Sequence, residues 1–344
     1  MCALKIDHSI VPKDSLVLVT GVNGLIGSHV ADQCLKAGFR VRGTARDTKK
    51  AAWVKDVFDK QYGPGRFEEI VVKDMAADGA FDDAVKGCVG VLHTANVMTF
   101  SANPHEVIPP TIAGATNCAR AAKNEPSVKR FVYTSSSTAC LTPQPNKEIV
   151  VDKDMWNQDA IKQAWKPPPY EESRAFEVYA ASKTQAEFEL WEFMKKEKPN
   201  FELSAVLPNM NTGRVISVAN QSHPSTTAFP VNLYQGNIDA VLGLAPQYWV
   251  DVEDDARLHV AALTRKDTAG ERIFAFTAPF NWNDFLAMYR KMFPDKKFAD
   301  DVQGLGRDLS KVPNGRAEEL LKEMGRPGWT SLEESLRNNL EGVA

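Results

Sequence analysis

Short apolar runs alternate with longer stretches of helical character along the first two thirds of the chain. A run of about five apolar residues that is bounded by turn residues is typical of a strand buried on both faces. Residues 15–20 form such a run, and six alternations of predicted strand and helix predict a doubly wound α/β fold with a parallel sheet. The predicted strands are residues 15–20, 39–44, 68–73, 90–95, 128–134 and 201–207.

The pattern changes after residue 208. Proline, glycine and polar residues are frequent between 209 and 237, which predicts loop and lid. Helices are predicted at 251–263 and 281–293 with a strand at 271–277 between them, and His259 is expected to be a packed helix residue. We therefore expect a Rossmann dinucleotide-binding domain in residues 1–208, completed by about 239–278, and a smaller C-terminal α/β substrate lobe in residues 209–238 and 279–344.

The first predicted strand leads directly into a glycine-rich turn and a helix. Glycines allow the backbone to turn sharply and to approach a pyrophosphate, whose charge is stabilised at the helix N-terminus. A glycine turn without a ligand is the alternative, but the strand before it and the helix after it favour nucleotide binding. The residues expected to contact the dinucleotide here are Gly21, Asn23, Gly24, Leu25, Ile26 and Gly27.

The residue that closes the second strand predicts which dinucleotide is bound. An acidic residue there binds the ribose 2′-hydroxyl of NAD, whereas an arginine accommodates the 2′-phosphate of NADP. Arg46 occupies this position and Lys50, one helical turn on, adds a second cation. If the strand ends one residue later, Asp47 takes the position and favours NAD. We expect NADPH.

Polar and small residues follow the other predicted strands. Asp74 follows the third strand, where it suits the adenine amino group, although a loop cap is the alternative. Ser136 follows the fifth strand, and a hydroxyl at the carboxyl end of a central strand lies where α/β sheets bind ligands, although serines there are also common turn formers. The remaining residues expected to line the cofactor groove are Met75, Thr94, Ala95, Thr134 and Ser135.

Residues 174–194 are rich in helix formers and contain Tyr179 and Lys183. Positions four apart share one face of a helix, so a phenol and an ammonium are presented together. A nearby cation favours the phenolate and makes the phenol a better acid near neutral pH. A solvated surface pair is the alternative, and the upstream motifs favour the catalytic interpretation.

The composition and net charge indicate which kinds of binding partner can be expected. Hydrophobic residues make up 43% and charged residues 25% of the 344 residues, and the net charge is −3. This balance gives no electrostatic reason to expect nucleic acid or an anionic membrane as the main partner. No apolar run reaches about 18 residues and the N-terminus lacks the apolar core of a signal peptide, so a cytoplasmic protein is expected.

Cysteine and histidine usage adds two expectations. The five cysteines are scattered singly, which argues against a disulfide framework and for a reducing compartment. The six histidines form no metal-binding motif, so no metal site is expected. The cysteines are Cys2, Cys34, Cys88, Cys118 and Cys140.

Together these motifs resemble those of the extended short-chain dehydrogenase/reductases, over about residues 16–337. Within that family the chain is most similar to fungal NADPH-dependent aldehyde and ketone reductases of the methylglyoxal-reductase type, with plant dihydroflavonol reductases as more distant relatives. The motifs that carry the resemblance are Val19-Thr-Gly-Val-Asn-Gly24, Arg42-Gly-Thr-Ala-Arg46, Tyr133-Thr-Ser-Ser136, Tyr179-Ala-Ala-Ser-Lys183, Leu207-Pro-Asn209 and Gly325-Arg-Pro-Gly-Trp329.

The resemblance implies a role for each matching residue. Ser136 would hydrogen-bond the oxygen of a small-molecule carbonyl substrate, Tyr179 would protonate it, and Lys183 would hold the nicotinamide ribose and lower the tyrosine pKa. Pro208 and Asn209 would contact the nicotinamide carboxamide, and Ser225 or Thr226 a phosphate. Two departures stand out: Gly114-Ala115 replaces the Gly-Thr of relatives, which weakens a proton-relay role for Asn117, and the 222–229 loop matches poorly.

Other functions on the same scaffold remain open at this point. A nucleotide-sugar epimerase or dehydratase would retain NAD and usually carries an acidic residue in place of Arg46. A non-catalytic NADP(H)-sensing module commonly lacks the Tyr/Lys pair, and a plant-like flavonoid reductase differs only in substrate. A monomer or homodimer is expected, with residues 140–173 at the active-site rim. An apolar pocket could be lined by Phe100, Trp165, Phe176, Phe229, Tyr234 and Trp249, although aromatic residues at such positions are more often core.

Overall fold

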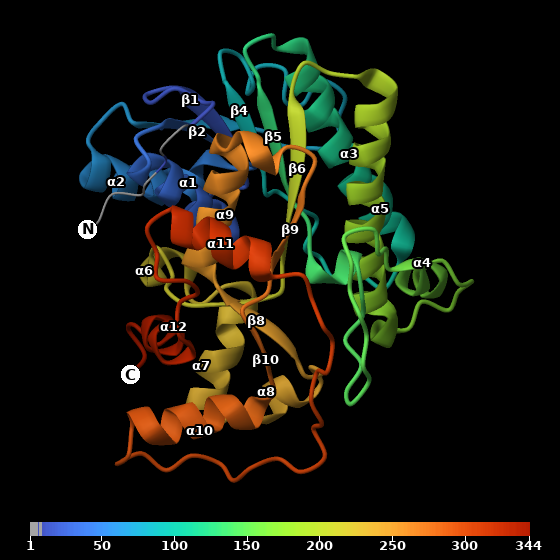
Figure 1. Cartoon of the computed structure of the whole chain (residues 1–344), viewed down its shortest axis with the longest axis vertical. Helices are drawn as coiled ribbons and strands as arrows, with labels where there is room; N and C mark the ends of the chain where they lie inside the picture. Colours follow the sequence, from blue (N-terminus) through green and yellow to red (C-terminus); the bar gives the residue numbers. More distant parts are fainter. Residues whose placement is uncertain (1–5, 7–8) are drawn as a thin grey trace.

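Seven parallel strands form the larger sheet of the computed structural model, which describes residue 6 and residues 9–344 (Figure 1). These strands are β1 (Leu16–Thr20), β2 (Arg40–Ala45), β3 (Phe67–Val71), β4 (Gly90–His93), β5 (Arg130–Thr134), β6 (Glu202–Pro208) and β9 (Arg272–Ala275). Their order is β3-β2-β1-β4-β5-β6-β9, and each neighbouring pair is parallel. The chain returns from the β3 edge to place β4 beside β1, which creates the switch point where such sheets bind ligands. The predicted doubly wound fold is confirmed.

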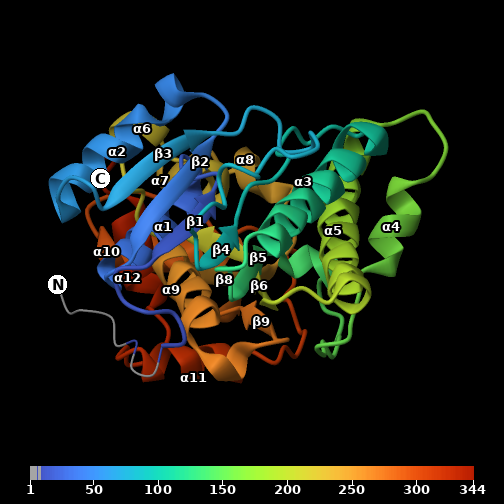
Figure 2. The ribbon, with the colours of Figure 1, turned by 90° about the horizontal axis from the view of Figure 1, so that it is seen from above.

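Helices cover both faces of this sheet (Figure 2). The central strand β1 is buried on both faces and is a continuous apolar run, in which Val17, Leu18 and Val19 are fully buried. By contrast, β2 and the edge strand β3 carry charged residues at partly exposed positions. One face packs against α1 (Leu25–Lys36), α2 (Thr48–Tyr62), α9 (Val252–Thr264) and α11 (Gly315–Glu323), and the other against α3 (Pro104–Asn124) and α5 (Ala175–Glu197), with α4 (Gln158–Ala164) packed on α5.

Helix α5 carries the predicted phenol and ammonium. Its 23 residues include neither Gly nor Pro, and the helix ends where Lys198 adopts a left-handed conformation (φ 43°) before Pro199. Ala180, Ala181 and Ala186 are fully buried and allow α5 to pack closely against its neighbours. The predicted helix at 174–194 is therefore confirmed, and it continues to Glu197.

A second, three-stranded sheet of order β10-β8-β7 organises the smaller lobe in the lower part of Figure 1. Its core is aromatic, with Trp249, Phe280, Trp282 and Tyr289 buried together. The elements are β7 (Met210–Thr212), β8 (Gln247–Asp251), β10 (Ala278–Phe280), α6 (Val218–Gln221), α7 (Ala228–Tyr234), α8 (Asp239–Leu242), α10 (Trp282–Met292) and α12 (Leu332–Asn339), and short 3₁₀ turns lie at Ser137–Ala139, Glu172–Arg174, Ser225–Thr227 and Lys266–Thr268.

Two predictions for this part of the chain need correction. Residues 209–237 are not loop and lid throughout, because β7, α6 and α7 lie within them. These elements span three to seven residues, too few to show a hydrophobic period. The helix predicted from residue 251 begins at Val252, since Asp251 ends β8 and its carboxylate accepts a hydrogen bond from the Glu253 N–H as a cap. The division of the chain at 208, 239 and 278 stays a prediction; β8 adds residues 247–251 to the smaller sheet.

Three further expectations concern membrane-spanning segments, the cysteines and the N-terminal stretch. None of the helices formed by the described residues is both long and apolar enough to span a bilayer. Cys34, Cys88, Cys118 and Cys140 are buried free thiols. Cys2 and nearly all of the N-terminal stretch examined for a signal peptide lie outside the described residues.

Candidate active site

The glycine-rich turn after β1 is built for close backbone approach. Gly21 has φ +68°, a conformation that favours glycine. A Cβ on Gly27 would lie 2.2 Å from the Gly21 carbonyl oxygen and 2.8 Å from Thr94 Oγ1, so only glycine fits there without movement. Gly24 is the N-cap of α1 and offers no side chain to the first-turn N–H groups. The turn therefore fits a pyrophosphate at the positive end of a helix.

Thr20 joins this turn to the end of β4. Its Oγ1 accepts hydrogen bonds from the Thr94 and Ala95 N–H groups, both at 3.0 Å. The Thr94 hydroxyl in turn donates to the Thr20 carbonyl. A Cβ on Gly21 would lie 3.1 Å from Ala95 Cα, so the two segments are in contact. The structure thus places the predicted Thr94 and Ala95 beside the glycine turn, together with Asn23 and the start of α1 at Leu25 and Ile26.

Arg46 immediately follows the last residue of β2 and its side chain is exposed. Asp47 is the N-cap of α2, and its Oδ1 accepts a hydrogen bond of 2.9 Å from the Lys49 N–H. The strand therefore ends before Arg46, and the carboxylate that would favour NAD is engaged in a helix cap. Lys50 lies in the first turn of α2 and is exposed. These residues fit a 2′-phosphate better than a 2′-hydroxyl.

The loop after β3 is shaped by local bonds. Asp74 Oδ1 accepts a hydrogen bond of 2.9 Å from the Ala76 N–H, so the alternative of a loop cap is observed. Asn117 Nδ2 donates to the carbonyl oxygens of Met75 (3.4 Å), Ala76 (3.0 Å) and Ala77 (3.0 Å). A Cβ on Gly114 would lie 2.7 Å from Met75 Cγ. Asn117 and Gly114 thus hold Met75 against α3, and Asn117 has a positioning role for this loop.

The carboxyl end of β5 and helix α5 bring the three predicted catalytic side chains together. Lys183 Nζ donates a 2.6 Å hydrogen bond to the Thr134 carbonyl oxygen. The side chain of Ser136 lies close enough to Tyr179 to influence its hydroxyl. Ser136 Oγ also accepts from the Thr138 N–H (3.2 Å) and hydroxyl (2.9 Å), which leaves its own proton for another acceptor. Tyr179 is half-buried, so its ring borders solvent.

Burial controls the charges at this site. It lowers the pKa of Lys183 to about 7, against the raising influence of Glu187. Burial also raises the pKa of Tyr179, while the nearby Ser136 side chain acts in the opposite direction. Tyr179 is therefore a protonated phenol near neutral pH. The expectation that Lys183 lowers the tyrosine pKa below its usual value is not seen, because desolvation dominates.

Glu187 is a buried residue that the sequence interpretation missed. Its carboxylate pairs with Arg272 at 2.7 Å and 3.1 Å and accepts a 2.5 Å hydrogen bond from Ser135 Oγ. The Ser135 hydroxyl, predicted to contact the cofactor, is therefore directed to Glu187. A signal for Glu187 was present in the sequence: Tyr179, Lys183 and Glu187 are spaced by four on a helix face that is otherwise apolar.

The segment after β6 crosses from the large sheet to the small one. Asn209 is 8% exposed, its N–H donates to the Ala275 carbonyl at 3.3 Å, and its Oδ1 accepts from the Met210 N–H at 2.8 Å. Pro208 ends β6, which is parallel to β5. Pro208 and Asn209 therefore lie at the edge of the sheet where β5 also has its carboxyl end. Of the two candidates for a phosphate contact, Thr226 donates its hydroxyl to the Asn211 carbonyl, whereas Ser225 is exposed.

The six aromatic residues that could line a pocket lie in three different places. Phe100 and Phe176 lie beside the ring of Tyr179, with centroid distances of 5.4 Å and 6.4 Å, and both are exposed. Phe229, Tyr234 and Trp249 pack in the core of the smaller lobe. Trp165 is the C-cap of α4, and its Nε1 donates a hydrogen bond to Gln185. Phe100 and Phe176 therefore form the aromatic rim of the candidate site.

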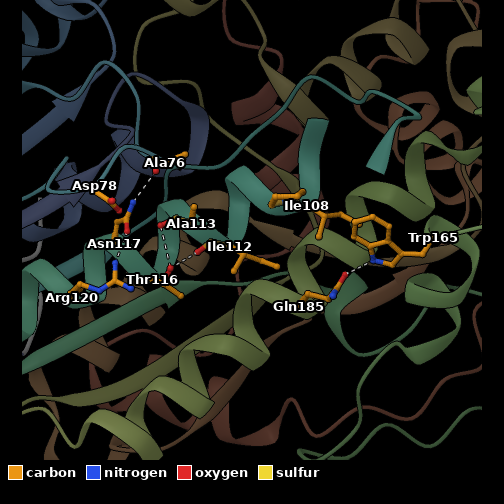
Figure 3. Close-up of a pocket in the computed structure, with 11 residues that line it drawn as sticks. Ala76, Asp78, Ile108, Ile112, Ala113, Thr116, Asn117, Arg120, Trp165 and Gln185 are labelled. Carbon is orange, nitrogen blue, oxygen red and sulfur yellow. Dashed lines mark hydrogen bonds between the residues drawn. The ribbon is translucent and has the colours of Figure 1, made fainter. Parts of the chain in front are cut away.

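A pocket of about 450 Å³ lies away from the catalytic side chains, along α3 (Figure 3). Trp165 and Gln185 line one end and Asn117 and Arg120 the other, whereas Ser136, Tyr179 and Lys183 do not contribute. A separate pocket of about 430 Å³ lies between the glycine turn and α6, lined by Asn23, Lys49, Lys50, Trp53, Asn220, Gln221 and Pro224. The second pocket is the one that adjoins the predicted dinucleotide site.

One group of potential metal ligands occurs among the described residues: His29, Asp32 and Glu253. Lys36 Nζ lies 2.7 Å from Asp32, and Arg214 lies 3.0 Å from Glu253. Cations from the protein thus neutralise both carboxylates, and the cationic neighbours hold the pKa of Glu253 at about 2 despite its burial. The expected absence of a metal site stays a prediction.

Comparisons with known proteins place the chain among reductases. The sequence pattern of the NAD dependent epimerase/dehydratase family matches residues 17–275. Aldehyde reductase 2 of Sporidiobolus salmonicolor is 44% identical over 336 residues, which cover 97% of each chain. A ketoreductase of Penicillium rubens is 37% identical, with 97% of this chain and 98% of that protein covered. The structure of Gre2 from Candida albicans in complex with NADPH superposes with a TM-score of 0.80 at 24% identity, over 96% of this chain and 98% of the other.

Proposed function

Because the chain belongs to the NAD dependent epimerase/dehydratase family, within the extended short-chain dehydrogenase/reductases, we propose that Ser136, Tyr179 and Lys183 carry out carbonyl reduction. The protein is an NADPH-dependent oxidoreductase that converts aldehydes or ketones to alcohols. The observation that carries the assignment is the meeting of a phenol, a serine hydroxyl and a buried lysine at the carboxyl end of β5. This end lies one strand from the β1/β4 switch point.

Each side chain has a separate task at this site. Ser136 donates a hydrogen bond to the substrate oxygen and so polarises the carbonyl group. Tyr179 holds a proton on its hydroxyl and transfers it to that oxygen, and its raised pKa keeps this proton in place near neutral pH. Lys183 presents an ammonium at the junction of β5 and α5. Bound NADPH supplies the two electrons and the hydrogen that the carbonyl carbon receives.

The residues at the end of β2 support NADPH over NAD. Arg46 is exposed beside the strand end, Lys50 follows in the first turn of α2, and Asp47 is engaged as a helix cap. The nucleotide-sugar epimerase alternative is disfavoured by the same observation, because such enzymes use an acidic residue there. Substrates with an aryl group or a keto ester are favoured, since Phe100 and Phe176 border the Tyr179 ring. A cytoplasmic location and a monomeric or homodimeric state stay predictions.

A substrate panel tests the activity. Purified protein is incubated with aliphatic aldehydes, α-keto esters and aryl ketones, each with NADPH and with NADH, and oxidation of the cofactor is followed by absorbance. We expect turnover of the aryl ketones and keto esters with NADPH, and a much lower kcat/KM with NADH. Turnover of none of these carbonyls, or retention of tightly bound NAD on purification, would contradict the proposal.

Tyr179→Phe tests the proton donor. Removal of the hydroxyl takes away the acid while the ring stays, so kcat is expected to fall by about 10²–10⁴-fold. The Kd for NADPH, measured by fluorescence titration, is expected to change little. Tyr170→Phe, in the loop before α5, is the matched control and should retain full activity. Near-normal turnover by Tyr179→Phe would show that another group donates the proton.

A further inference from the structure

Thr134 is fixed by hydrogen bonds to two helices that lie on opposite faces of the sheet. Its carbonyl oxygen accepts a 2.6 Å hydrogen bond from Lys183 on α5. Its hydroxyl forms a 2.7 Å hydrogen bond with His259 Nε2 on α9. Thr134 is the last residue of β5, and Ser136 follows two residues later. Thr134 thus connects Lys183 on one face of the sheet with His259 on the opposite face, and it lies two residues before Ser136.

The directions of these bonds follow from the atoms involved. His259 Nδ1 lies 2.8 Å from the Asp255 carbonyl oxygen, which can only accept, so Nδ1 carries a proton. In the neutral ring Nε2 is then the acceptor, and the Thr134 hydroxyl donates to it. The rotamer of Thr134 is fixed as a result. The last peptide of β5, to which Lys183 is bonded, is held by both its side chain and its main chain.

The burial of His259 and Asp255 lowers the stability of the fold, because both polar side chains lose their solvation. Both His259 and Asp255 are fully buried, and the Asp255 Oδ1 lies 3.4 Å from His259 Nδ1. Among the described residues, neither carboxylate oxygen of Asp255 has a hydrogen-bond partner. An apolar residue at either position would avoid the loss of solvation that buried polar groups incur. The buried carboxylate favours a proton on Nδ1, the arrangement that leaves Nε2 of the neutral ring to accept from the Thr134 hydroxyl.

We propose that His259 is a positioning residue for carbonyl reduction: by holding the Thr134 hydroxyl, it fixes the carbonyl that anchors Lys183 and the strand end that carries Ser136. The inference rests on the proposed function, since it assigns Lys183 and Ser136 to the site. His259 lies on α9, on the face of the sheet opposite α5, and its hydrogen bonds go to Thr134 and to the Asp255 carbonyl. Its effect is exerted through one hydrogen bond, which makes it separable from a role in core packing.

The experiment compares variants that remove this bond from either end. His259→Leu replaces the imidazole with an apolar side chain of similar size. Thr134→Val removes the hydroxyl but keeps the carbonyl, and the double variant removes both partners. His259→Gln retains an acceptor near the position of Nε2. Thr264→Val, which loses a buried hydroxyl bond to Val260 in the same helix, is the matched control. For each variant we measure Tm, the Kd for NADPH by fluorescence titration, and kcat and KM for the carbonyl.

A misplaced Lys183 is expected to lower kcat by about 10- to 100-fold in His259→Leu and Thr134→Val. The Kd for NADPH should rise several-fold in both, and the KM for the carbonyl should change less than kcat. The double variant should be no slower than either single variant, because both remove the same bond. His259→Gln should recover most of kcat, and Thr264→Val should match the wild type in kcat whatever its Tm.

Three outcomes would overturn the inference. His259→Leu and Thr134→Val could retain kcat and the NADPH Kd within about twofold of wild type. Their effects could multiply in the double variant, or His259→Gln could be as slow as His259→Leu, either of which would indicate separate packing defects. If wild-type protein turns over carbonyls and Tyr179→Phe abolishes this, such results refute the role of His259 alone. Failure of the wild type in the carbonyl panel would instead refute the proposed function.

Discussion

Lys183 shows how strongly the fold changes the chemistry of a single residue. On a solvated helix a lysine stays protonated well above neutral pH. Here Lys183 is 3% exposed, lies 4.8 Å above the ring of Tyr133, and donates to a main-chain carbonyl. Burial brings its pKa to about 7, although Glu187 partly offsets this shift. The ammonium is therefore present below about pH 7 and is lost above it, whereas Tyr179 keeps its proton throughout this range.

The pH dependence of the reaction should report this residue. The value of kcat/KM with NADPH as the varied substrate reflects ionisations of the free protein. We expect it to be constant at low pH and to decrease as pH rises through about 7, because Lys183 loses its charge there. A steady-state profile between pH 5.5 and 9 measures this. In Lys183→Arg, whose guanidinium stays charged, kcat/KM should not decrease over this pH range. A wild-type kcat/KM that stays constant up to pH 9 would contradict the role given to the Lys183 charge.

At the scale of elements, steric contacts at Gly27 determine how closely α1 packs against the end of β1. Gly27 sits in the first turn of α1, where the helix backbone passes against the Gly21 carbonyl and the side chain of Thr94, the residue that follows β4. A side chain there would push the helix away from both strands. The same contact places the first-turn N–H groups of α1 beside the switch point, so packing and anion binding depend on one small residue.

Gly27→Ala is expected to be costly for this reason. Its Cβ would lie 2.2 Å from the Gly21 carbonyl oxygen, so the turn must move. Overpacking of this kind lowers the free energy of unfolding by about 1–3 kcal/mol, and the NADPH Kd should rise as well. Gly243→Ala at the C-cap of α8, where a Cβ meets nothing within 4 Å, should leave both unchanged. Urea unfolding and fluorescence titration test this, and equal stability of the two variants would count against it.

At the scale of the whole molecule, the smaller lobe reaches over the dinucleotide end of the larger sheet. Gln221 of α6 donates its Nε2 to the Asn23 carbonyl at 3.2 Å and to Ser28 Oγ at 3.4 Å. On the opposite side, the Asn146 N–H donates to the Arg307 carbonyl at 2.7 Å, so the segment after α10 returns to the larger lobe. The two lobes are therefore joined by a side-chain contact at the glycine turn and by a main-chain contact between the segments that contain Asn146 and Arg307.

Gln221→Ala should weaken cofactor binding without affecting the chemical step. It removes a hydrogen bond that holds the glycine turn, and a bond worth about 1 kcal/mol corresponds to a rise in the NADPH Kd of roughly 5-fold. We expect kcat at saturating NADPH to change less than twofold. Gln303→Ala, at an exposed position after α10, is the control. A larger loss in kcat than in affinity would place Gln221 in the chemistry instead.

The sequence by itself determined the features that depend on neighbouring residues. The alternation of short strand-like runs with helical segments indicated the six strands, and the first of them is a continuous apolar run because it is buried on both faces. The glycine spacing, Arg46 after β2, and the four-residue spacing of Tyr179 and Lys183 gave the candidate site, since each follows from local backbone geometry. The resemblance to reductases rested on the same local motifs.

Only the tertiary structure decided what depends on contacts between distant residues. The pairing of the three-residue strand β7 with β8, the Glu187–Arg272 pair, and the bond from His259 to Thr134 join residues 38 or more positions apart. No periodic pattern encodes such pairs. The direction of the pKa shifts at Lys183 and Tyr179 was likewise fixed by burial, which is a property of the packed molecule and not of the two side chains.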